Sequence, residues 1–284
     1  MILVTGATGT VGSEVVKQLI EAGEKVRVLS RDPEKVAKKL GSKVEVAQGD
    51  LEKPETLDAA FSGVEKVFVL STGPDLAKLE GNAYAAAQKA GVKHIVKLSA
   101  QGADMNPGIQ LGRWHRESEE KLKSTKIAWT VIRPGNFSSN TLMWADSIKG
   151  QGVVYHPTGE GKTTPIDPRD IAAVAVKALT TPGHEGKAYN LTGPESLSGA
   201  EQVAKIGEAI GKPLKFVDVP ESAAREGMLK SGMPEVLVNA VLELMGAIRA
   251  GHGGAVDPTA EQVLGRKLRS FDAWVKDNAA AFKS

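Results

Sequence analysis

The chain begins with a short apolar run, followed at once by a glycine-rich turn and an amphipathic helix. Residues 2–4 are continuously apolar, as in a parallel strand that is buried on both faces. The next segment carries apolar residues at helical spacing and stops before Gly23. Its apolar stripe consists of Val11, Val15, Val16, Leu19 and Ile20. The pattern predicts a strand–turn–helix unit at the start of a parallel α/β fold.

Strand and helix patterns then alternate as far as residue 132. The further strands expected are 25–29, 44–48, 67–70, 94–98 and 128–132. The helices expected between them are 32–40, 54–61, 76–90 and 112–123. Such alternation favours right-handed crossovers and a doubly wound, Rossmann-type parallel sheet in the strand order 3-2-1-4-5-6. A ligand of this fold binds at the carboxyl ends of the strands.

The pattern loosens after Pro134. Short strands are indicated near Val153 and Tyr155, and a helix at 168–180 and a strand at 188–191 could return to the main sheet. Beyond Ser198 the expected elements are helices at 200–210, 223–230, 234–250 and 271–280. We therefore expect a Rossmann domain and a smaller, mostly helical substrate-side lobe. The first comprises residues 1–134, with 165–192 rejoining it, and the second comprises residues 135–164 and 193–284.

The glycines of the first turn, Gly6, Gly9 and Gly12, indicate a dinucleotide site. One glycine allows the tight turn, one lets the backbone approach a pyrophosphate, and one packs the helix against the strand. The first N–H groups of the helix face the anion. The triplet has one more residue between its first two glycines than the commonest fingerprint, and an ordinary glycine-rich turn is the alternative. Its position between a strand and a helix favours the dinucleotide site.

The end of the second expected strand bears on which dinucleotide binds. An NAD site usually places Asp or Glu there, whereas this chain has Ser30 and Arg31. A guanidinium can bind a ribose 2′-phosphate through two hydrogen bonds, and Lys35 adds a second charge one helical turn later. The alternative is that Arg31 is a solvated surface residue. Asp50, after the third strand, could accept a hydrogen bond from adenine or be an ordinary turn aspartate.

Composition excludes several other classes of protein. Lys and Arg number 36 and Asp and Glu 34 in 284 residues, so the net charge of +2 gives no electrostatic case for a nucleic-acid partner. The absence of cysteine excludes disulfides, thiolate metal sites and a cysteine nucleophile, and the five histidines share no metal-ligand spacing, so no metal is expected. We see no signal peptide and no membrane span. A cytoplasmic protein is expected.

Six motifs resemble the NmrA-like group of atypical short-chain dehydrogenase/reductases, which includes the type 2 quinone and triphenylmethane reductases. They are residues 4–12, 30–35, 49–51, 90–94, 115–119 and 133–136. The resemblance implies phosphate binding by residues 8–11 and Arg31, a cofactor trough at Ser71 and Thr72, and Ser99 beside the nicotinamide. The cofactor-binding residues expected are Gly6, Thr8, Gly9, Thr10, Val11, Gly12, Ser30, Arg31, Lys35, Asp50, Leu51, Ser71 and Thr72.

The catalytic positions depart from the pattern of the superfamily, in which a Tyr-x-x-x-Lys motif supplies the acid. Aligning the helix at 112–123 puts Leu111 and His115 at those two places. His115 could donate a proton, because its ordinary pKa lies near neutrality, or bind the nicotinamide ribose. It could also be a solvent-bonded helix residue. We take His115 and Ser99 as the catalytic candidates.

The same resemblance places substrate-facing residues after the sixth strand. They are Asn136, Phe137, Asn140 and Trp144, although Phe137 and Trp144 could equally belong to the core. The function expected is an NADPH-dependent reductase of a quinone or a similar small electrophile, with NADH as a possible cofactor. The alternative is a non-catalytic redox sensor that acts through a protein partner. The substrate itself, and the choice between monomer and homodimer, stay open.

Overall fold

The computed structural model describes residues 1–283, which divide into two compact units. The first unit comprises Met1–Gly108, Gly112–Arg133 and Pro168–Asn190. The second comprises Ile109–Leu111, Pro134–Asp167 and residues 191–283. Each unit is therefore built from segments that are separated in the sequence.

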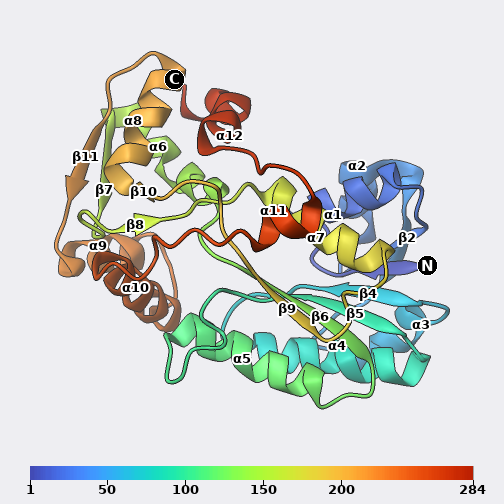
Figure 1. Ribbon diagram of the computed structural model, residues 1–284. Coiled ribbons are helices and arrows are strands. Elements are labelled where there is room, and N and C mark those ends of the chain that lie inside the picture. The colour runs from blue at the N-terminus through green and yellow to red at the C-terminus, as the bar shows by residue number, and fades with distance from the viewer. Residues whose placement is uncertain (284) are drawn as a thin grey trace. The chain divides into compact units, whose positions relative to one another are not determined.

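A seven-stranded sheet forms the centre of the first unit (Figure 1), in the order β3-β2-β1-β4-β5-β6-β9. The strands are β1 Ile2–Val4, β2 Val26–Ser30, β3 Glu45–Gln48, β4 Lys66–Val69, β5 His94–Leu98, β6 Ala128–Pro134 and β9 Lys187–Leu191. The pairings within β1 to β6 are parallel. The Rossmann-type sheet and its predicted strand order are confirmed, and the strand predicted at 188–191 extends the sheet beyond β6.

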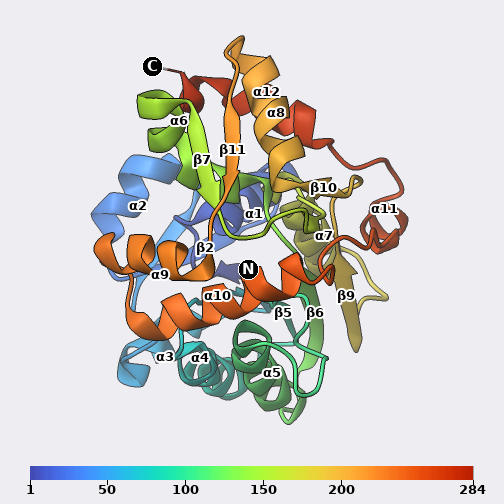
Figure 2. The same ribbon diagram turned by 90° about the vertical axis from the view of Figure 1, so that its left-hand side faces the viewer.

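Helices cover both faces of this sheet, as Figures 1 and 2 show. One face carries α1 (Thr10–Glu21) and α7 (Pro168–Thr180), which pack against each other. The other face carries α4 (Leu76–Ala90) and α5 (Gln110–Lys123). The shorter helices are α2 Pro33–Leu40, α3 Leu57–Phe61 and the 3₁₀ turns Gly41–Lys43 and Pro54–Thr56. The helix expected at 54–61 thus begins as a 3₁₀ turn.

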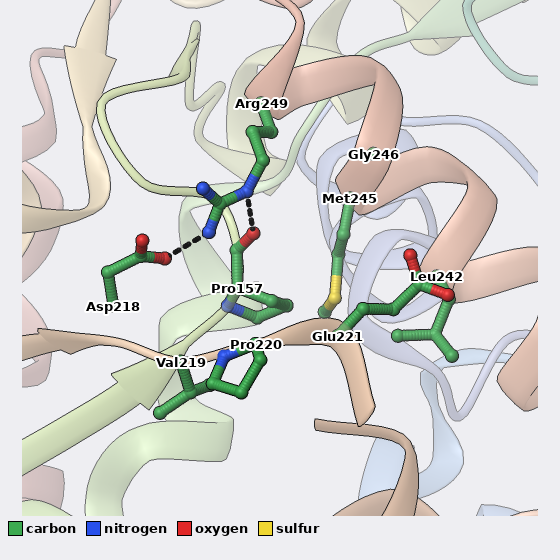
Figure 3. Close-up of a pocket in the computed structure, with 9 residues that line it drawn as sticks. All are labelled: Pro157, Asp218, Val219, Pro220, Glu221, Leu242, Met245, Gly246 and Arg249. Atoms are coloured by element: carbon green, nitrogen blue, oxygen red, sulfur yellow. Dashed lines mark hydrogen bonds and ion pairs between the residues drawn. The ribbon is translucent and has the colours of Figure 1, made fainter. Parts of the chain in front are cut away.

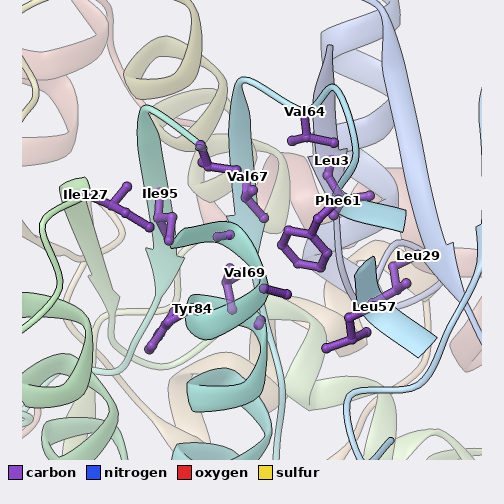
Figure 4. Packing of buried hydrophobic residues seen from close by; sticks show 14 of the residues in the cluster. Leu3, Leu29, Leu57, Phe61, Val64, Val67, Val69, Tyr84, Ile95 and Ile127 are labelled. Atoms are coloured by element: carbon purple, nitrogen blue, oxygen red, sulfur yellow. The ribbon is translucent and has the colours of Figure 1, made fainter. Parts of the chain in front are cut away.

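Apolar side chains between the sheet and the helices α3 and α4 form the core of the first unit (Figure 4). Val67, Val69 and Ile95 point from β4 and β5 into this layer, where Phe61 and Tyr84 meet them from the helices. These residues are at most 2% exposed. Burial of this surface fixes the strands, so the loops at their carboxyl ends are held on a rigid frame.

The second unit contains helices and two small sheets. Its helices are α6 Ala145–Gln151, α8 Gly199–Ile210, α9 Glu221–Lys230, α10 Glu235–Arg249, α11 Thr259–Leu264, α12 Phe271–Asn278 and the 3₁₀ segments Ser138–Trp144 and Ala279–Phe282. In one sheet, β7 (Val153–His156) pairs in parallel with β11 (Lys215–Asp218). In the other, β8 (Lys162–Thr163) is antiparallel to β10 (Leu197–Ser198). The helical character was predicted, whereas α6, α11, β8, β10 and β11 were missed.

Two features of other protein classes are absent from residues 1–283. No helix there is long and apolar enough to cross a membrane. No group of three or more His, Asp or Glu side chains in that range is arranged to hold a metal ion.

Candidate active site

A cavity of about 380 Å³ opens in the first unit where its strands end. The segments that line it follow β1, β2, β3 and β4, so the cavity lies at the carboxyl ends of the parallel strands, as expected for this fold. Its lining residues are Thr5, Gly6, Ala7, Thr8, Leu29, Ser30, Arg31, Gly49, Asp50, Leu51, Glu52, Thr72 and Leu79. Seven of the predicted cofactor-binding residues are therefore brought to one cavity: Gly6, Thr8, Ser30, Arg31, Asp50, Leu51 and Thr72.

The glycine turn has the geometry that close approach of an anion requires. Gly6 has φ +61°, which favours glycine, and its carbonyl accepts a hydrogen bond from Gly9 N–H at 2.9 Å. A Cβ on Gly12 would lie 2.2 Å from the Gly6 oxygen, so that glycine allows the helix to pack against the turn. Gly9 is the exposed N-cap of α1, and no side chain caps the helix. Thr10 is exposed at its first position, whereas Val11 is buried beneath it.

Arg31 lies at the edge of the cavity and is exposed. Its guanidinium makes no hydrogen bond or ion pair with the described residues, while Ser30 Oγ donates to the Asp32 carbonyl at 2.9 Å. Asp32 caps α2 by accepting from the Lys35 N–H at 3.0 Å, and Lys35 is exposed but does not line the cavity. An exposed cation with no carboxylate partner suits a phosphate group.

The loop after β3 contributes both predicted and missed residues to the cavity. Asp50 Oδ1 accepts from the Glu52 N–H at 3.0 Å, the contact of an ordinary turn aspartate, while Asp50 also lines the cavity. Leu51 lines the cavity as well, and its carbonyl accepts from Asn82 Nδ2 at 2.7 Å. Glu52 was not predicted, although it directly follows the family motif at 49–51.

The turn after β4 connects the cavity to a buried polar network. Thr72 lines the cavity, whereas Ser71 is turned to Glu80, which accepts from the Ser71 N–H at 3.1 Å and from its hydroxyl at 3.2 Å. Glu80 also forms a fully buried ion pair with Lys97 at 2.9 Å. Lys97 Nζ in turn lies 3.3 Å from His115 Nδ1. The sequence prediction of Ser71 as a cofactor residue therefore stays untested, and its hydroxyl serves the network.

A second network holds Ser99. Its hydroxyl donates to Glu119 Oε1 at 2.6 Å, and Arg133 binds both carboxylate oxygens of Glu119, at 2.9 and 2.6 Å. Burial alone would raise the pKa of Glu119, but hydrogen bonds from Arg133 and Ser99 outweigh it and lower the pKa to about 2. Lys123 adds an ion pair at 3.0 Å. The Ser99 proton is thus directed toward a carboxylate that is ionised at physiological pH.

His115 does not have the near-neutral pKa on which its role as a proton donor was predicted. Burial, followed by the charge of Lys97, lowers the pKa of His115 to about 3, and Glu119 opposes this only in part. The imidazole is therefore neutral at physiological pH. This corrects the premise of the prediction: His115 can donate a hydrogen bond, but no imidazolium is present to release a proton.

The sequence analysis missed the charged members of these networks. They are Glu80, Lys97, Glu119 and Arg133, and all four are buried. One signal was available at Lys97, because it stands inside the apolar strand pattern of β5, where its neighbours Val96 and Leu98 are buried. A lysine at such a place is nearly always paired.

The predicted substrate residues all belong to the second unit. Asn136 Oδ1 accepts from Asn140 Nδ2 at 2.8 Å, and Asn136 Nδ2 lies 3.3 Å from Thr163 Oγ1. Phe137 is half-buried, and Trp144 packs against the apolar core of this unit with its ring 5.7 Å from that of His156. Their part in substrate binding stays a prediction.

The second unit also has a cavity of its own, of about 430 Å³ (Figure 3). Met245 and Leu242 on α10 face Pro157 and Pro220 across it, and Arg249 lies at one end. Arg249 is occupied by an ion pair with Asp218 and by a hydrogen bond from its Nε to the Pro157 carbonyl at 2.8 Å.

The Ser99 network predicts how the free energy of unfolding depends on pH. The folded pKa of Glu119 lies below its ordinary 4.5, so its stabilisation is present above that pH and is lost as pH falls toward 2. Glu119→Gln should cost roughly 3 kcal/mol at pH 7 and much less at pH 2.5, which urea unfolding at both pH values measures. The control is Glu117→Gln, an exposed residue of α5 that should cost below about 0.5 kcal/mol. An equal cost for Glu119→Gln at both pH values contradicts the expectation.

The chain is similar to known proteins that bind NAD(P)H. The model of the NAD(P)H-binding family matches residues 6–182. An NAD(P)H azoreductase from Xenophilus azovorans is 44% identical over 283 residues, covering 99% of both chains. A (4-alkanoyl-5-oxo-2,5-dihydrofuran-3-yl)methyl phosphate reductase from Streptomyces griseus is 42% identical over 284 residues, again covering 99% of both.

Two solved structures are similar over almost the whole chain. The quinone oxidoreductase QOR2 of Escherichia coli in complex with NADPH has a TM-score of 0.88 at 27% identity, covering 98% of this chain and 99% of that one. The triphenylmethane reductase of a Citrobacter species in complex with NADP(H) has a TM-score of 0.85 at 26% identity, covering 98% and 100%. The resemblance inferred from the motifs is confirmed.

Proposed function

The chain belongs to the NAD(P)H-binding family and is an oxidoreductase, and we propose that it transfers hydride from NADPH to a quinone or a similar conjugated electrophile. Bound NADPH supplies the hydride at its nicotinamide. The glycine turn and the exposed Arg31, which has no carboxylate partner in the part of the chain that the structure describes, fit the phosphates of this cofactor. The choice of acceptor depends on the other end of the site.

One observation carries the proposal: none of the candidate catalytic groups is set up to act as a general acid. Leu111 stands where the superfamily has its acidic tyrosine, and the Ser99 proton is directed to Glu119 at 2.6 Å. His115 is neutral, because its pKa is about 3. An acceptor that needs simultaneous protonation would be reduced slowly at such a site.

A conjugated acceptor removes that need. A quinone takes the hydride with its two electrons, the negative charge spreads over the ring and its oxygens, and a proton from water then completes the hydroquinone as NADP⁺ forms. The protein has to bring the two reactants together and exclude misaligned arrangements. The names of the two relatives denote azo compounds and an oxo-dihydrofuran, which also contain conjugated multiple bonds.

The direct test follows the absorbance of NADPH on mixing the purified protein with quinones and with azo dyes. We expect oxidation of NADPH that depends on both the protein and the acceptor. His115→Ala should lower the rate without abolishing it, because hydride transfer needs no proton from this residue. No turnover with any conjugated acceptor contradicts the proposal and favours the sensor reading.

Replacement of Arg31 tests the preference for NADPH. Loss of a charge-assisted contact to the 2′-phosphate should cost about 1.5 to 3 kcal/mol, or at least tenfold in affinity, in Arg31→Ala. NADH lacks this phosphate, so its affinity should change little. Calorimetric titration with both reduced cofactors measures the difference, with Lys35→Ala as a comparison because Lys35 does not line the cavity. Equal losses for NADPH and NADH would overturn this assignment of Arg31.

A further inference from the structure

The network that ends at His115 contains a lysine to which hydride transfer assigns no role. Lys97 lies on β5, near the middle of the seven-stranded sheet, and its side chain and that of Glu80 are fully buried. A buried ion pair adds little net stability over a well-packed apolar pair, because desolvation offsets the attraction. Stability alone does not account for two charges at this place.

The hydrogen bonds of Lys97 define the protonation of its neighbour. An ammonium group has three N–H donors and no lone pair. Three acceptors surround Lys97 Nζ: Glu80 Oε2 at 2.9 Å, the Leu98 carbonyl at 3.1 Å and His115 Nδ1 at 3.3 Å. Because the lysine can only donate, Nδ1 of His115 must accept and carries no proton. The single proton of the neutral ring is then on Nε2.

Glu80 is itself held from several sides. Its Oε1 accepts from the N–H and the hydroxyl of Ser71, and its Oε2 accepts from Tyr84 at 3.1 Å and from Ser118. These partners lie on the turn after β4, on α4 itself and on α5. A carboxylate with so many donors is fixed in place. It therefore anchors the lysine in one position.

We propose that Lys97 is a positioning residue: clamped by Glu80, it holds His115 as the neutral tautomer whose Nε2–H donates a hydrogen bond at the active site. The catalytic effect of this hydrogen bond rests on the proposed function, whereas the assignment of the tautomer is independent of it. A fixed N–H donor stabilises negative charge on the acceptor as hydride arrives, and it needs no reorganisation to do so. The histidine thus acts by hydrogen bonding, without transferring its proton.

Two charged groups act on the ring and influence its response to pH, and each is paired with a charge of the opposite sign. Lys97 approaches from β5, with Glu80 behind it on α4, and Glu119 lies one turn further along α5, paired with Arg133 from β6. The two cations are therefore each balanced by a carboxylate. Burial and the charge of Lys97 keep the pKa of His115 at about 3, so we expect the neutral form from pH 5 to 9.

Nuclear magnetic resonance of the full chain, with ¹⁵N-labelled histidine, reads the tautomer directly. Comparison with His115→Gln assigns the signals of this ring. We expect an unprotonated Nδ1 and a protonated Nε2 from pH 5 to 9, with no titration. A protonated Nδ1 in the wild type, or titration near pH 6.5, overturns the proposal.

Removal of the lysine should release the histidine. In Lys97→Met we expect the pKa of His115 to rise by about two units or more, from about 3 into the range above pH 5, and the Nδ1–H form to appear. The control is Lys93→Met, an exposed lysine just before the same strand, which should change neither. If Lys97→Met does not fold, the double variant Glu80→Gln/Lys97→Met removes both charges and gives the same readout. An unchanged tautomer and pKa in a folded Lys97 variant contradicts the proposal.

Kinetics separates this proposal from the proposed function. For quinone reduction we expect a kcat/KM that shows no His115 ionisation between pH 5 and 9 in the wild type, and an inflection in that range in Lys97→Met. If the tautomer is found as expected but no conjugated acceptor is reduced, the proposed function fails and the positioning of His115 by Lys97 stands. If quinones are reduced and the kinetics of Lys97→Met stay without the inflection, the positioning role fails while the proposed function stands.

Discussion

Unactivated ketones will be reduced at least about 100-fold more slowly than quinones of similar size. A ketone becomes an alkoxide as it accepts hydride, and a positioned acid typically contributes 10²- to 10⁴-fold to such a step. Leu111 has no proton to give, Ser99 is bonded to Glu119, and His115 is neutral. A quinone delocalises the incoming negative charge, so its reduction does not depend on a positioned acid.

Steady-state rates on paired quinones and ketones at a fixed NADPH concentration measure the ratio. A Leu111→Tyr variant should be measured with the same substrates, because it restores the residue type that the superfamily uses at this place. Its ketone rate should rise relative to its quinone rate if a positioned acid is what the site lacks. Efficient ketone reduction by the wild type would show that another group supplies the proton.

Gly9→Val should reduce the affinity for NADPH by more than 100-fold while leaving the fold intact. The residue is exposed at the N-cap of α1 and has φ −81°, a conformation that a side chain adopts readily. A Cβ there would lie 3.2 Å from the Gly6 oxygen, which a shift of a few tenths of an ångström relieves. The valine side chain would occupy the place of the pyrophosphate at the helix N-terminus.

Two further glycines provide the controls. Gly12→Ala would put its Cβ 2.2 Å from the Gly6 oxygen, so it should lower the urea midpoint as well as cofactor affinity. Gly227→Val on α9 meets nothing within 4 Å and should leave NADPH binding unchanged. Calorimetric titration and urea unfolding on the three variants distinguish loss of a ligand contact from loss of the turn. Wild-type affinity in Gly9→Val would place the phosphate site elsewhere.

Much of the fold could be predicted because its strands are strongly patterned. The parallel strands β1 and β5 are buried along their length. β1 is a continuous apolar run and β5 has the apolar residues Ile95, Val96 and Leu98, and the alternation of such strands with helices defines the topology. The small sheets of the second unit lack this signal. β8 and β10 have two residues each, and β11 is a half-exposed Lys-Phe-Val-Asp segment that pairs with a strand about 60 residues earlier.

The cavity at the ends of the strands was predictable for a similar local reason, since most of its residues lie in short motifs directly after strands. The environment of His115 was not. Its pKa depends on Lys97, which is brought to it by the packing of α5 against the sheet, and Lys97 depends in turn on Glu80 from another helix. Hydrophobic patterns report which positions face the core, but not which buried polar groups satisfy one another there.

The discontinuity of the first unit has a consequence for the order in which the chain folds during synthesis. Until residue 190 has left the ribosome, α1 lacks the helix α7 that packs against it, and β6 lacks its neighbour β9. Gln18 on α1 also bonds the Arg169 carbonyl at 3.0 Å, across about 150 residues. At roughly 5 to 20 residues per second, β6 has no hydrogen-bonding neighbour at this edge of the sheet for several seconds while residues 135–190 are made. Any chaperone that acts on this protein during synthesis has this edge to protect.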